Sequence, residues 1–479
     1  KYPSVLQIST RPYLYALSQQ TGKTIKTLRD IPDSVFDEFK SKKFDYVWFM
    51  GVWQVGEYGV KHDRESESLV SGFKQLLHDY TEEDVIGSPY APTDYVCNKE
   101  LCPNGDSDLL WLKEKLNSMG MRLMLDFVPN HFALDSPLID ENKDYFIQSP
   151  KGSKPPYDPS RYFYNGIAYG NMQWSSAWSD VAQLNYYNPD TRKMMTEKLK
   201  TVAKFADGIR CDMAYIMLND YFYGTWQDEL DSYGWKKPDD EFWLNAIKEV
   251  KSLYPEVIFL AEVYGDYYIN LINLGFDFTY DKELLDRFRS GDMDNIREWI
   301  AKTDKYSSHL CRFIENHDDN RATEMFGYYI KRTDITALAT YTLPGMKFYF
   351  QDQWFAYKNK LDVHLRRSAS ESKSEEAIEF YDKLFEIVNQ NIFRNGDYTY
   401  LYPDGETNWR LICISWRNNS TGEKLLVVVN YTDESGWGKV KLSDITGSGS
   451  IQLKELISGV TYDRNRDEIR SMGLYVGLD

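Results

Sequence analysis

The sequence lacks the motifs that usually mark metal and nucleotide sites. It has only six His and contains no HxH, HExxH or paired CxxC motif, so clustered ligands for a catalytic metal are not indicated. No GxGxxG follows an apolar strand and no P-loop is present, which argues against a bound nucleotide. We therefore expect no cofactor and no metal-dependent chemistry.

Long apolar runs and an excess of positive charge are also absent. No apolar stretch approaches the roughly 20 residues that a membrane span needs. The chain has 56 Lys and Arg against 73 Asp and Glu, a formal net charge of −17. Such a surface repels phosphate backbones and anionic membranes. We expect neither nucleic acid nor a membrane as partner, and a ligand that is neutral or cationic. We also expect the protein to be a monomer.

Cysteine is scarce, with five residues in the whole chain. Cys97 and Cys102 are close enough in sequence to pair across a tight loop. The other three lie inside apolar runs and are expected to be small buried residues, namely Cys211, Cys311 and Cys413.

Two features bear on the cellular location. The chain begins at Lys1 rather than Met, which indicates that a signal peptide or other leading sequence was removed. Sequons for N-glycosylation occur at Asn418, Asn419 and Asn430 and fit a secreted protein. We expect secretion or a vacuolar or lysosomal location, with the cytoplasm as the alternative.

Aromatic residues are abundant at 15% of the chain, with 37 Tyr and 13 Trp. They fit either large interfaces between domains or a site that binds sugars, because aromatic rings offer flat apolar faces for stacking. Composition alone leaves both interpretations open.

Eight short apolar segments alternate with helical patterns over about the first four-fifths of the chain. Alternating strands and helices predict a parallel sheet, and eight such units predict a closed (β/α)8 TIM barrel. The predicted strands are Ser4–Ile8, Tyr46–Val52, Leu123–Val128, Gly208–Met213, Val257–Val263, Phe276–Tyr280, Cys311–Ile314 and Met346–Phe350.

The spacing of these segments is uneven and predicts three domains. We assign the barrel to residues 1–131 and 189–393, and a lobe inserted after the third strand to 132–188, which is rich in Pro, Gly and Tyr and has no helical period. A second long insertion covers about 54–95. Residues 394–479 are predicted to form a C-terminal antiparallel β-sandwich with strands Trp409–Trp416, Lys424–Val429, Lys439–Leu442 and Ile451–Leu456.

Four of the predicted strands end in acidic, basic or His residues. Polar residues at the carboxyl ends of barrel strands are where barrel enzymes carry out their chemistry. The four segments therefore predict one active site whose principal charged groups are carboxylates. They are DFVPNH (Asp126–His131), GIRCDMAY (Gly208–Tyr215), FLAEVYG (Phe259–Gly265) and FIENHDD (Phe313–Asp319).

Two of the carboxylates suit a pair of catalytic roles. Arg210 and Asp212 point to the same face of one strand, so the guanidinium can keep the carboxylate ionised, as a nucleophile requires. A structural ion pair is the alternative. Glu262 ends an apolar run, where burial raises the pKa of a carboxyl and suits it as an acid, unless it lies in open solvent. Retaining glycoside hydrolysis uses such a pair.

Together the four segments resemble the conserved regions of the α-amylase family of glycoside hydrolases. The resemblance implies a (β/α)8 barrel and a double displacement that retains the anomeric configuration. By matching position, Asp212 is the expected nucleophile and Glu262 the expected acid and base. Asp318 is expected to bind sugar hydroxyls and support ring distortion.

The resemblance also assigns supporting roles. Arg210 is expected to orient the nucleophile, with Asp126 as its support. His131 and His317 are expected to hydrogen-bond sugar hydroxyls. Tyr90, in GSPYAPTDY, matches the tyrosine that stacks on the sugar at the site of cleavage.

The chain departs from the family pattern in three places. The stretch after the nucleophile reads MAYIML, where many members have a Lys-His pair that contacts sugar and calcium. Asn130 matches a calcium ligand, but Gln183 stands where an Asp ligand is common, so structural calcium is possible but not favoured. The stretch PGMKFYFQDQW (Pro344–Trp354) lacks the common YGxE pattern.

These features predict an enzyme that cleaves α-glucosidic bonds, chiefly α-1,4 bonds, in starch, glycogen or maltooligosaccharides. A transglycosylase or isomerase acting on short α-glucosides is the alternative within the family. A non-catalytic carbohydrate-binding relative is less favoured, because such relatives typically lose one of the three carboxylates and all three are present here.

Overall fold

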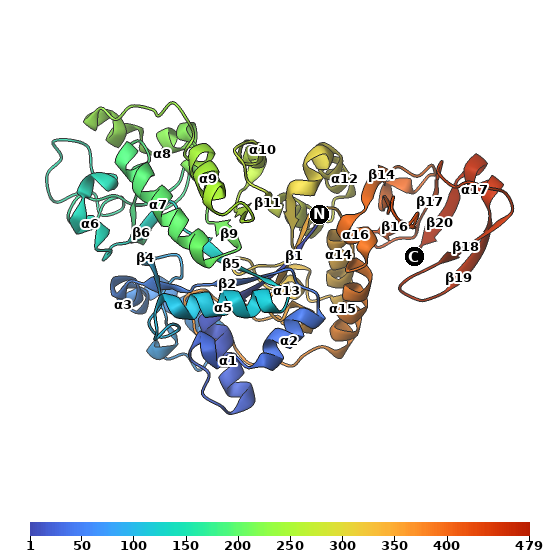
Figure 1. Ribbon diagram of the computed structural model, residues 1–479, viewed down its shortest axis with the longest axis horizontal. Coiled ribbons are helices and arrows are strands. Elements are labelled where there is room, and N and C mark those ends of the chain that lie inside the picture. Colours follow the sequence, from blue (N-terminus) through green and yellow to red (C-terminus); the bar gives the residue numbers. More distant parts are fainter.

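Eight parallel strands form a closed barrel in the computed structural model, which describes all residues from Lys1 to Asp479 (Figure 1). The order around the barrel is β1-β13-β12-β11-β10-β9-β5-β2, so each barrel strand pairs with the next one along the chain. All eight predicted strands and the predicted barrel are confirmed. The strands are β1 (Ser4–Ser9), β2 (Tyr46–Met50), β5 (Arg122–Phe127), β9 (Gly208–Cys211), β10 (Ile258–Ala261), β11 (Phe278–Tyr280), β12 (Leu310–Arg312) and β13 (Met346–Phe350).

Helices lie outside the strands and cover the barrel (Figure 1). In α7 the side chain of Asn188 accepts a hydrogen bond from the Asp190 backbone N–H, and Pro189 fills the first turn. None of the helices has the length and apolar composition that crossing a bilayer requires. The longer helices are α1 (Thr10–Thr21), α5 (Asp106–Ser118), α7 (Pro189–Phe205), α8 (Asn219–Tyr233), α9 (Phe242–Leu253), α12 (Met293–Thr303), α14 (Ile330–Tyr341) and α15 (Glu375–Val388).

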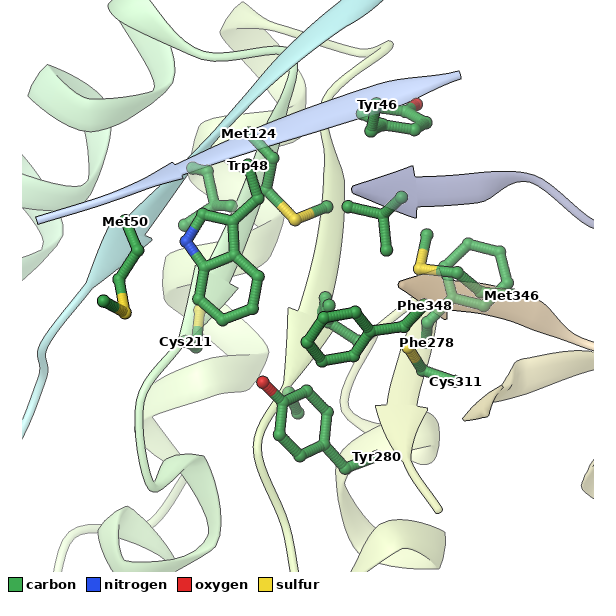
Figure 2. Close-up of a cluster of buried hydrophobic side chains, with 14 of the residues drawn as sticks. Tyr46, Trp48, Met50, Met124, Cys211, Phe278, Tyr280, Cys311, Met346 and Phe348 are labelled. Atoms are coloured by element: carbon green, nitrogen blue, oxygen red, sulfur yellow. The ribbon is translucent and has the colours of Figure 1, made fainter. Parts of the chain in front are cut away.

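Large side chains fill the inside of the barrel. Figure 2 shows Trp48, Met124, Tyr280 and Phe348 pointing toward one another from four different strands. The Trp48 and Phe348 ring centroids are 5.7 Å apart. Cys211 is among the buried residues of this core, and the three cysteines expected to be buried are all buried and unpaired. The barrel is therefore a packed core and not a channel, which leaves its edge for a site.

The two insertions carry secondary structure of their own. The segment after β5 forms a three-stranded sheet of order β6-β8-β7, and the other contains an antiparallel pair of strands joined through two short helices. Cys97 and Cys102 are joined in a disulfide with Cα atoms 6.0 Å apart. These elements are β6 (His131–Ala133), β7 (Tyr169–Gly170), β8 (Trp178–Gln183), β3 (Trp53–Val55), β4 (Pro92–Cys97), α3 (Glu57–Glu65) and α4 (Glu67–Leu76).

All the sheets of the C-terminal part are antiparallel, as expected. They are β14-β15-β16, β17-β20 and β18-β19. The buried Trp416 anchors the first sheet to the barrel, because its Nε1 donates to the Thr342 carbonyl over 3.0 Å. The elements are β14 (Asp397–Leu401), β15 (Leu411–Arg417), β16 (Lys424–Asn430), β17 (Gly436–Val440), β18 (Ser450–Lys454), β19 (Thr461–Asn465), α17 (Arg466–Met472) and β20 (Leu474–Leu478).

Candidate active site

One guanidinium at the carboxyl edge of the barrel binds three carboxylates. Arg210 on β9 donates from Nη1 to Asp212 Oδ1 over 2.8 Å and to Asp126 Oδ1 over 3.3 Å. Its Nη2 donates to Glu262 Oε2 over 2.8 Å. The two terminal nitrogens of one guanidinium thus bind Asp212 and Glu262, which directly follow the neighbouring strands β9 and β10.

The strand register accounts for this convergence. Asp126 on β5 and Arg210 on β9 are direct partners in the parallel ladder. Backbone pairing continues past the strand ends, where the Glu262 N–H donates to the Cys211 carbonyl over 3.0 Å. Met213 then turns the chain with a left-handed φ of 42°, a costly conformation for a residue other than Gly, and its N–H donates to Glu262 Oε2 over 2.9 Å.

Burial dominates the electrostatics of this cluster. Arg210 is 0% exposed, and Asp126, Asp212 and Glu262 are all buried. Burial raises the pKa of Asp212 well above its ordinary value and the charge of Glu262 raises it further, while Arg210 lowers it. Burial also raises the pKa of Asp126. Since one cation faces three carboxylates, the cluster favours keeping a proton.

Asp126 links Arg210 to the core of the barrel. Its Oδ2 accepts a 2.8 Å hydrogen bond from Trp48 Nε1, which ties the cluster to the packed barrel core. Its Oδ1 accepts a 3.3 Å hydrogen bond from the Tyr90 hydroxyl. Asp126 is thus enclosed by protein donors, and no part of its carboxylate is free for a reacting group.

His317 and Asp318 lie in the loop that follows β12. His317 Nε2 lies 3.2 Å from Asp318 Oδ2, and its ring stacks on Tyr90 with centroids 5.2 Å apart. Desolvation raises the pKa of Asp318, but His317, Arg210 and Lys360 together lower it below its ordinary range. The Asp318 side chain is 48% exposed, so it is an ionised carboxylate open to solvent beside the buried cluster.

Gln7 is a site residue that sequence reasoning missed. Its Nε2 lies 2.6 Å from His317 Nδ1. This contact ties the first barrel strand to the residues that follow β12. The available signal was a polar residue in the middle of an apolar strand, Ser4–Ser9, that is buried throughout.

His131 is fully engaged by the protein. Its Nε2 lies 2.8 Å from the Tyr90 carbonyl and its Nδ1 lies 3.1 Å from Asn130 Nδ2. Burial lowers its pKa to about 4, so the ring is neutral near pH 7. His131 can therefore bind a sugar hydroxyl only if it gives up one of these two contacts. Its contact with the Tyr90 carbonyl is direct.

Tyr264 is a second residue that sequence reasoning did not assign. Its hydroxyl donates to Glu262 Oε1 over 2.7 Å. The two side chains are two positions apart in AEVYG, which in extended chain places both on one side. That spacing was the available signal.

A side-chain amide makes three hydrogen bonds at the position where many family members bind calcium. Gln183 Nε2 lies 2.9 Å from Asn130 Oδ1, 3.1 Å from the Asn130 carbonyl and 3.0 Å from the Leu184 carbonyl. The Gln183 amide nitrogen thus donates to three neighbouring oxygens. Elsewhere, too, no group of three or more His, Cys, Asp or Glu is arranged to hold a metal ion.

The sequence matches known proteins over about half of its length. Alpha-amylase 3 of Dictyoglomus thermophilum is 24% identical over 280 residues, which cover 53% of this chain and 51% of that protein. Maltase A1 of Drosophila melanogaster is 22% identical over 321 residues, 52% of each chain. The chain thus spans about half the length of the curated relatives it matches.

Solved structures share the fold over nearly the whole chain. An alpha-amylase from Lactobacillus plantarum matches with a TM-score of 0.70 at 20% identity, covering 100% of this chain and 96% of that one. A maltogenic alpha-amylase from Thermotoga neapolitana matches with a TM-score of 0.66 at 19% identity, covering 97% and 94%. At such identities these likenesses show the fold alone.

A family model describes residues 102–395 as an alpha amylase catalytic domain. The matched region includes β5, β9, β10 and β12, and therefore the carboxylates that Arg210 brings together. It covers more than half of the chain, which belongs to the alpha-amylase family of glycoside hydrolases.

Proposed function

We propose that the protein is a retaining glycoside hydrolase that cleaves α-glucosidic bonds, chiefly α-1,4 bonds, in starch, glycogen or maltooligosaccharides. The observation that carries this proposal is that the two terminal nitrogens of Arg210 bind Asp212 and Glu262. Two buried carboxylates held this close suit direct attack on an anomeric carbon, which requires a separation of about 5–5.5 Å. Family membership supports the substrate class.

The first step joins the sugar to Asp212. Arg210 holds Oδ1 of Asp212, which leaves Oδ2 to form a bond to the anomeric carbon. The glycosidic bond breaks, its electron pair passes to the leaving oxygen, and that oxygen takes the proton of Glu262. The products are a glucosyl ester of Asp212 and a free alcohol.

The second step releases the sugar. Glu262, now a carboxylate, takes a proton from water as the water oxygen bonds to the anomeric carbon. The ester bond breaks and its electron pair returns to Asp212. Two inversions at one carbon retain the configuration. Asp318, exposed and ionised, is suited to accept hydrogen bonds from sugar hydroxyls in both steps.

The site favours retention of the proton that the first step needs. Burial and the charge of Glu262 raise the pKa of Asp212, which favours retention of a proton in the unliganded site. For Asp212 to attack, that proton has to be on Glu262 once a sugar fills the site. The sugar ring displaces water and separates the two carboxylates from solvent, which strengthens the interaction between Arg210 and Asp212.

The products formed from maltotriose test this function. Proton NMR at early times should show the α anomer of newly formed reducing ends, with glucose and maltose as products. First appearance of the β anomer would contradict a retaining mechanism. Longer oligomers would favour a transglycosylase, a rearranged disaccharide an isomerase, and binding without turnover a non-catalytic relative.

We also propose that the protein does not use calcium at Asn130. Excess EDTA should leave the melting temperature unchanged, because the Gln183 amide already satisfies the three oxygens. The variant Gln183→Asp places a carboxylate among them, so its melting temperature should fall and recover on addition of calcium.

Gln148→Asp is the matched control, because the Gln148 amide makes only exposed hydrogen bonds in the same lobe. Its melting temperature should not respond to calcium. A wild-type protein that EDTA destabilises would show that a calcium site exists that the arrangement around Gln183 does not represent.

A secreted or vacuolar or lysosomal location remains our proposal, with the cytoplasm as alternative. The disulfide between Cys97 and Cys102 supports an oxidising compartment. Of the three sequons, Asn418 and Asn430 are buried, which leaves Asn419 as the exposed acceptor. A glycan on Asn419 in protein isolated from its source, found by peptide mass mapping, would support this location, and a reduced disulfide would contradict it.

A further inference from the structure

We propose that five titratable side chains at the edge of the inserted lobe form a latch, which joins the lobe to the barrel when its histidines are protonated and so positions Tyr90. The latch shares no residue with the catalytic cluster. Its effect on the fold is independent of the proposed function, whereas its effect on activity rests on that function. The five side chains, hereafter the lobe latch, are His62, Asp63, Asp180, Asp362 and His364.

The lobe latch joins three segments that are far apart in the sequence. His62 and Asp63 lie on α3, in the insertion after β2, and Asp180 lies on β8 of the lobe after β5. Asp362 and His364 lie in the loop between β13 and α15. The strands β13, β1, β2 and β5 are successive neighbours in the barrel, so the three segments meet over one side of it.

Hydrogen bonds connect these segments at the latch. His62 Nε2 lies 2.9 Å from the Ser179 hydroxyl on β8, and His62 Nδ1 lies 3.2 Å from Asp63 Oδ1. His364 Nδ1 lies 2.8 Å from Asp362 Oδ1. Asp63 is buried, and its second oxygen, Oδ2, has no hydrogen-bond partner. A buried carboxylate oxygen without a donor is costly, so nearby positive charge on the histidines compensates it.

The charges of the latch are coupled across the three segments. The hydrogen bond to Asp63 raises the pKa of His62, and the charge of Asp180 raises it further. Burial lowers the pKa of His364, but the hydrogen bond to Asp362 and the other two carboxylates raise it above its ordinary value. Burial and the charge of Asp63 raise the pKa of Asp180, which both histidines lower. With its acids ionised, the latch has one excess negative charge when both histidines are protonated and three when both are neutral.

Protonation of the histidines therefore stabilises the latch. A histidine whose folded pKa is raised adds stability below its unfolded value of about 6.5, and that stability is lost as pH rises through the folded value. Asp180, whose folded pKa is also raised, acts in the same direction. The other rings against the histidines are Tyr58, which stacks on His62, and Phe73, which packs on His364 from α4. Burial raises the pKa of Tyr58, so neither ring carries charge near neutral pH.

A packed path leads from the latch to the catalytic cluster. The ring of Trp178 on β8 packs edge-on against His131, with centroids 5.7 Å apart. His131 Nε2 lies 2.8 Å from the Tyr90 carbonyl, and the Tyr90 ring stacks on His317. Ala91, next to Tyr90, belongs to one apolar cluster with residues of β6 and β8. A lobe that moves away from the barrel therefore loosens Tyr90.

Hydrogen exchange of the wild-type protein tests the latch without any variant. Exchange of the β8 amides, corrected for the intrinsic rate, should be about fivefold faster at about pH 9 than at about pH 6, because the lobe opens more often. Exchange of the β9 amides in the barrel core is the internal control and should change less than twofold. Equal protection of β8 at both pH values would overturn the inference.

The double variant His62→Gln, His364→Gln tests the link to the reaction. Glutamine keeps hydrogen-bonding groups but carries no charge, so the variant should behave at about pH 6 as the wild type does at about pH 9. Its KM for maltotriose at about pH 6 should exceed that of the wild type about fivefold, and the difference should vanish at about pH 9. Its kcat should change less than twofold, because the catalytic carboxylates are untouched.

His309→Gln is the matched control, because His309 is exposed and contacts the Asp277 carbonyl at the amino end of the barrel. It should match the wild type at both pH values. A double variant whose KM stays raised at about pH 9 would assign the histidines a purely structural role and overturn the link to Tyr90. A wild-type protein without activity on maltotriose would overturn the proposed function, while the exchange of β8 still decides the latch.

Discussion

Replacing Asp212 with Asn should lower kcat/KM on maltotriose by about 10⁴-fold or more, because an amide cannot form the ester on which the second step depends. Asn keeps the shape of Asp and can still accept the hydrogen bond that Arg210 donates to Oδ1. The fold should therefore persist, which circular dichroism and a melting curve can establish. Initial rates at matched protein concentration measure the loss.

Asp220→Asn is the control, because Asp220 lies eight residues further along and its carboxylate is exposed. It should retain wild-type activity. A second measurement identifies the role of Asp212: in Asp212→Ala, azide should convert α-glucosyl fluoride into β-glucosyl azide, since azide then attacks from the face that the carboxylate vacates. A loss below tenfold in Asp212→Asn, or an α-azide product, would show that Asp212 is not the nucleophile.

The variant Arg210→Met should be the most destabilised of those considered. The guanidinium is 0% exposed and is the partner of three buried carboxylates. Removing one partner of a buried ion pair leaves uncompensated charge and costs about 3–5 kcal/mol. The free energy of unfolding in urea at pH 7 measures this cost. Met fills much of the same volume, so a cavity contributes little.

The destabilisation of Arg210→Met should depend on pH in a defined direction. Burial raises the pKa of Asp126 and Asp212 in the folded protein, and Arg210 opposes that shift. Without Arg210 the folded pKa values rise further, while the unfolded values stay near about 4. A carboxyl whose folded pKa is raised loses stability as pH increases through that window.

The difference in stability between wild type and Arg210→Met should therefore be smallest below about pH 4, where the carboxyls are protonated in both states, and should widen toward pH 7. Arg287→Met is the control, since Arg287 pairs with Glu283 near the surface. It should change stability by less than about 1 kcal/mol at either pH. Equal stability of Arg210→Met and wild type at pH 7 would refute the role given to this cluster.

The barrel could be predicted because its strands are buried on both faces. A run such as Leu123–Val128 is apolar except for Asp126 and is buried throughout, as expected of a strand in a parallel sheet covered by helices. Asn188 and Pro189 likewise predict the start of α7 by local capping alone. These signals are contained in a few adjacent residues, so one sequence is enough to detect them.

The strands that were missed lack such signals. All five residues of β19 are exposed, so no alternation of apolar and polar residues distinguishes Thr461–Asn465 from a loop. It is a strand because it pairs with β18, and that pairing is a tertiary contact. The strands β14 and β20 were also missed, and each likewise pairs with a strand elsewhere in the chain.

The motif residues and their order along the chain are enough to name the family and the three carboxylates, since each follows an apolar run and all such runs end at one edge of a barrel. Which atoms meet depends on register and turns that act over long separations. Gln7 reaches His317 across 310 residues, and the Met213 N–H reaches Glu262 Oε2 from the loop after the neighbouring strand. Hydrogen bonds of this kind require positions set by the whole barrel, so only the folded chain reveals them.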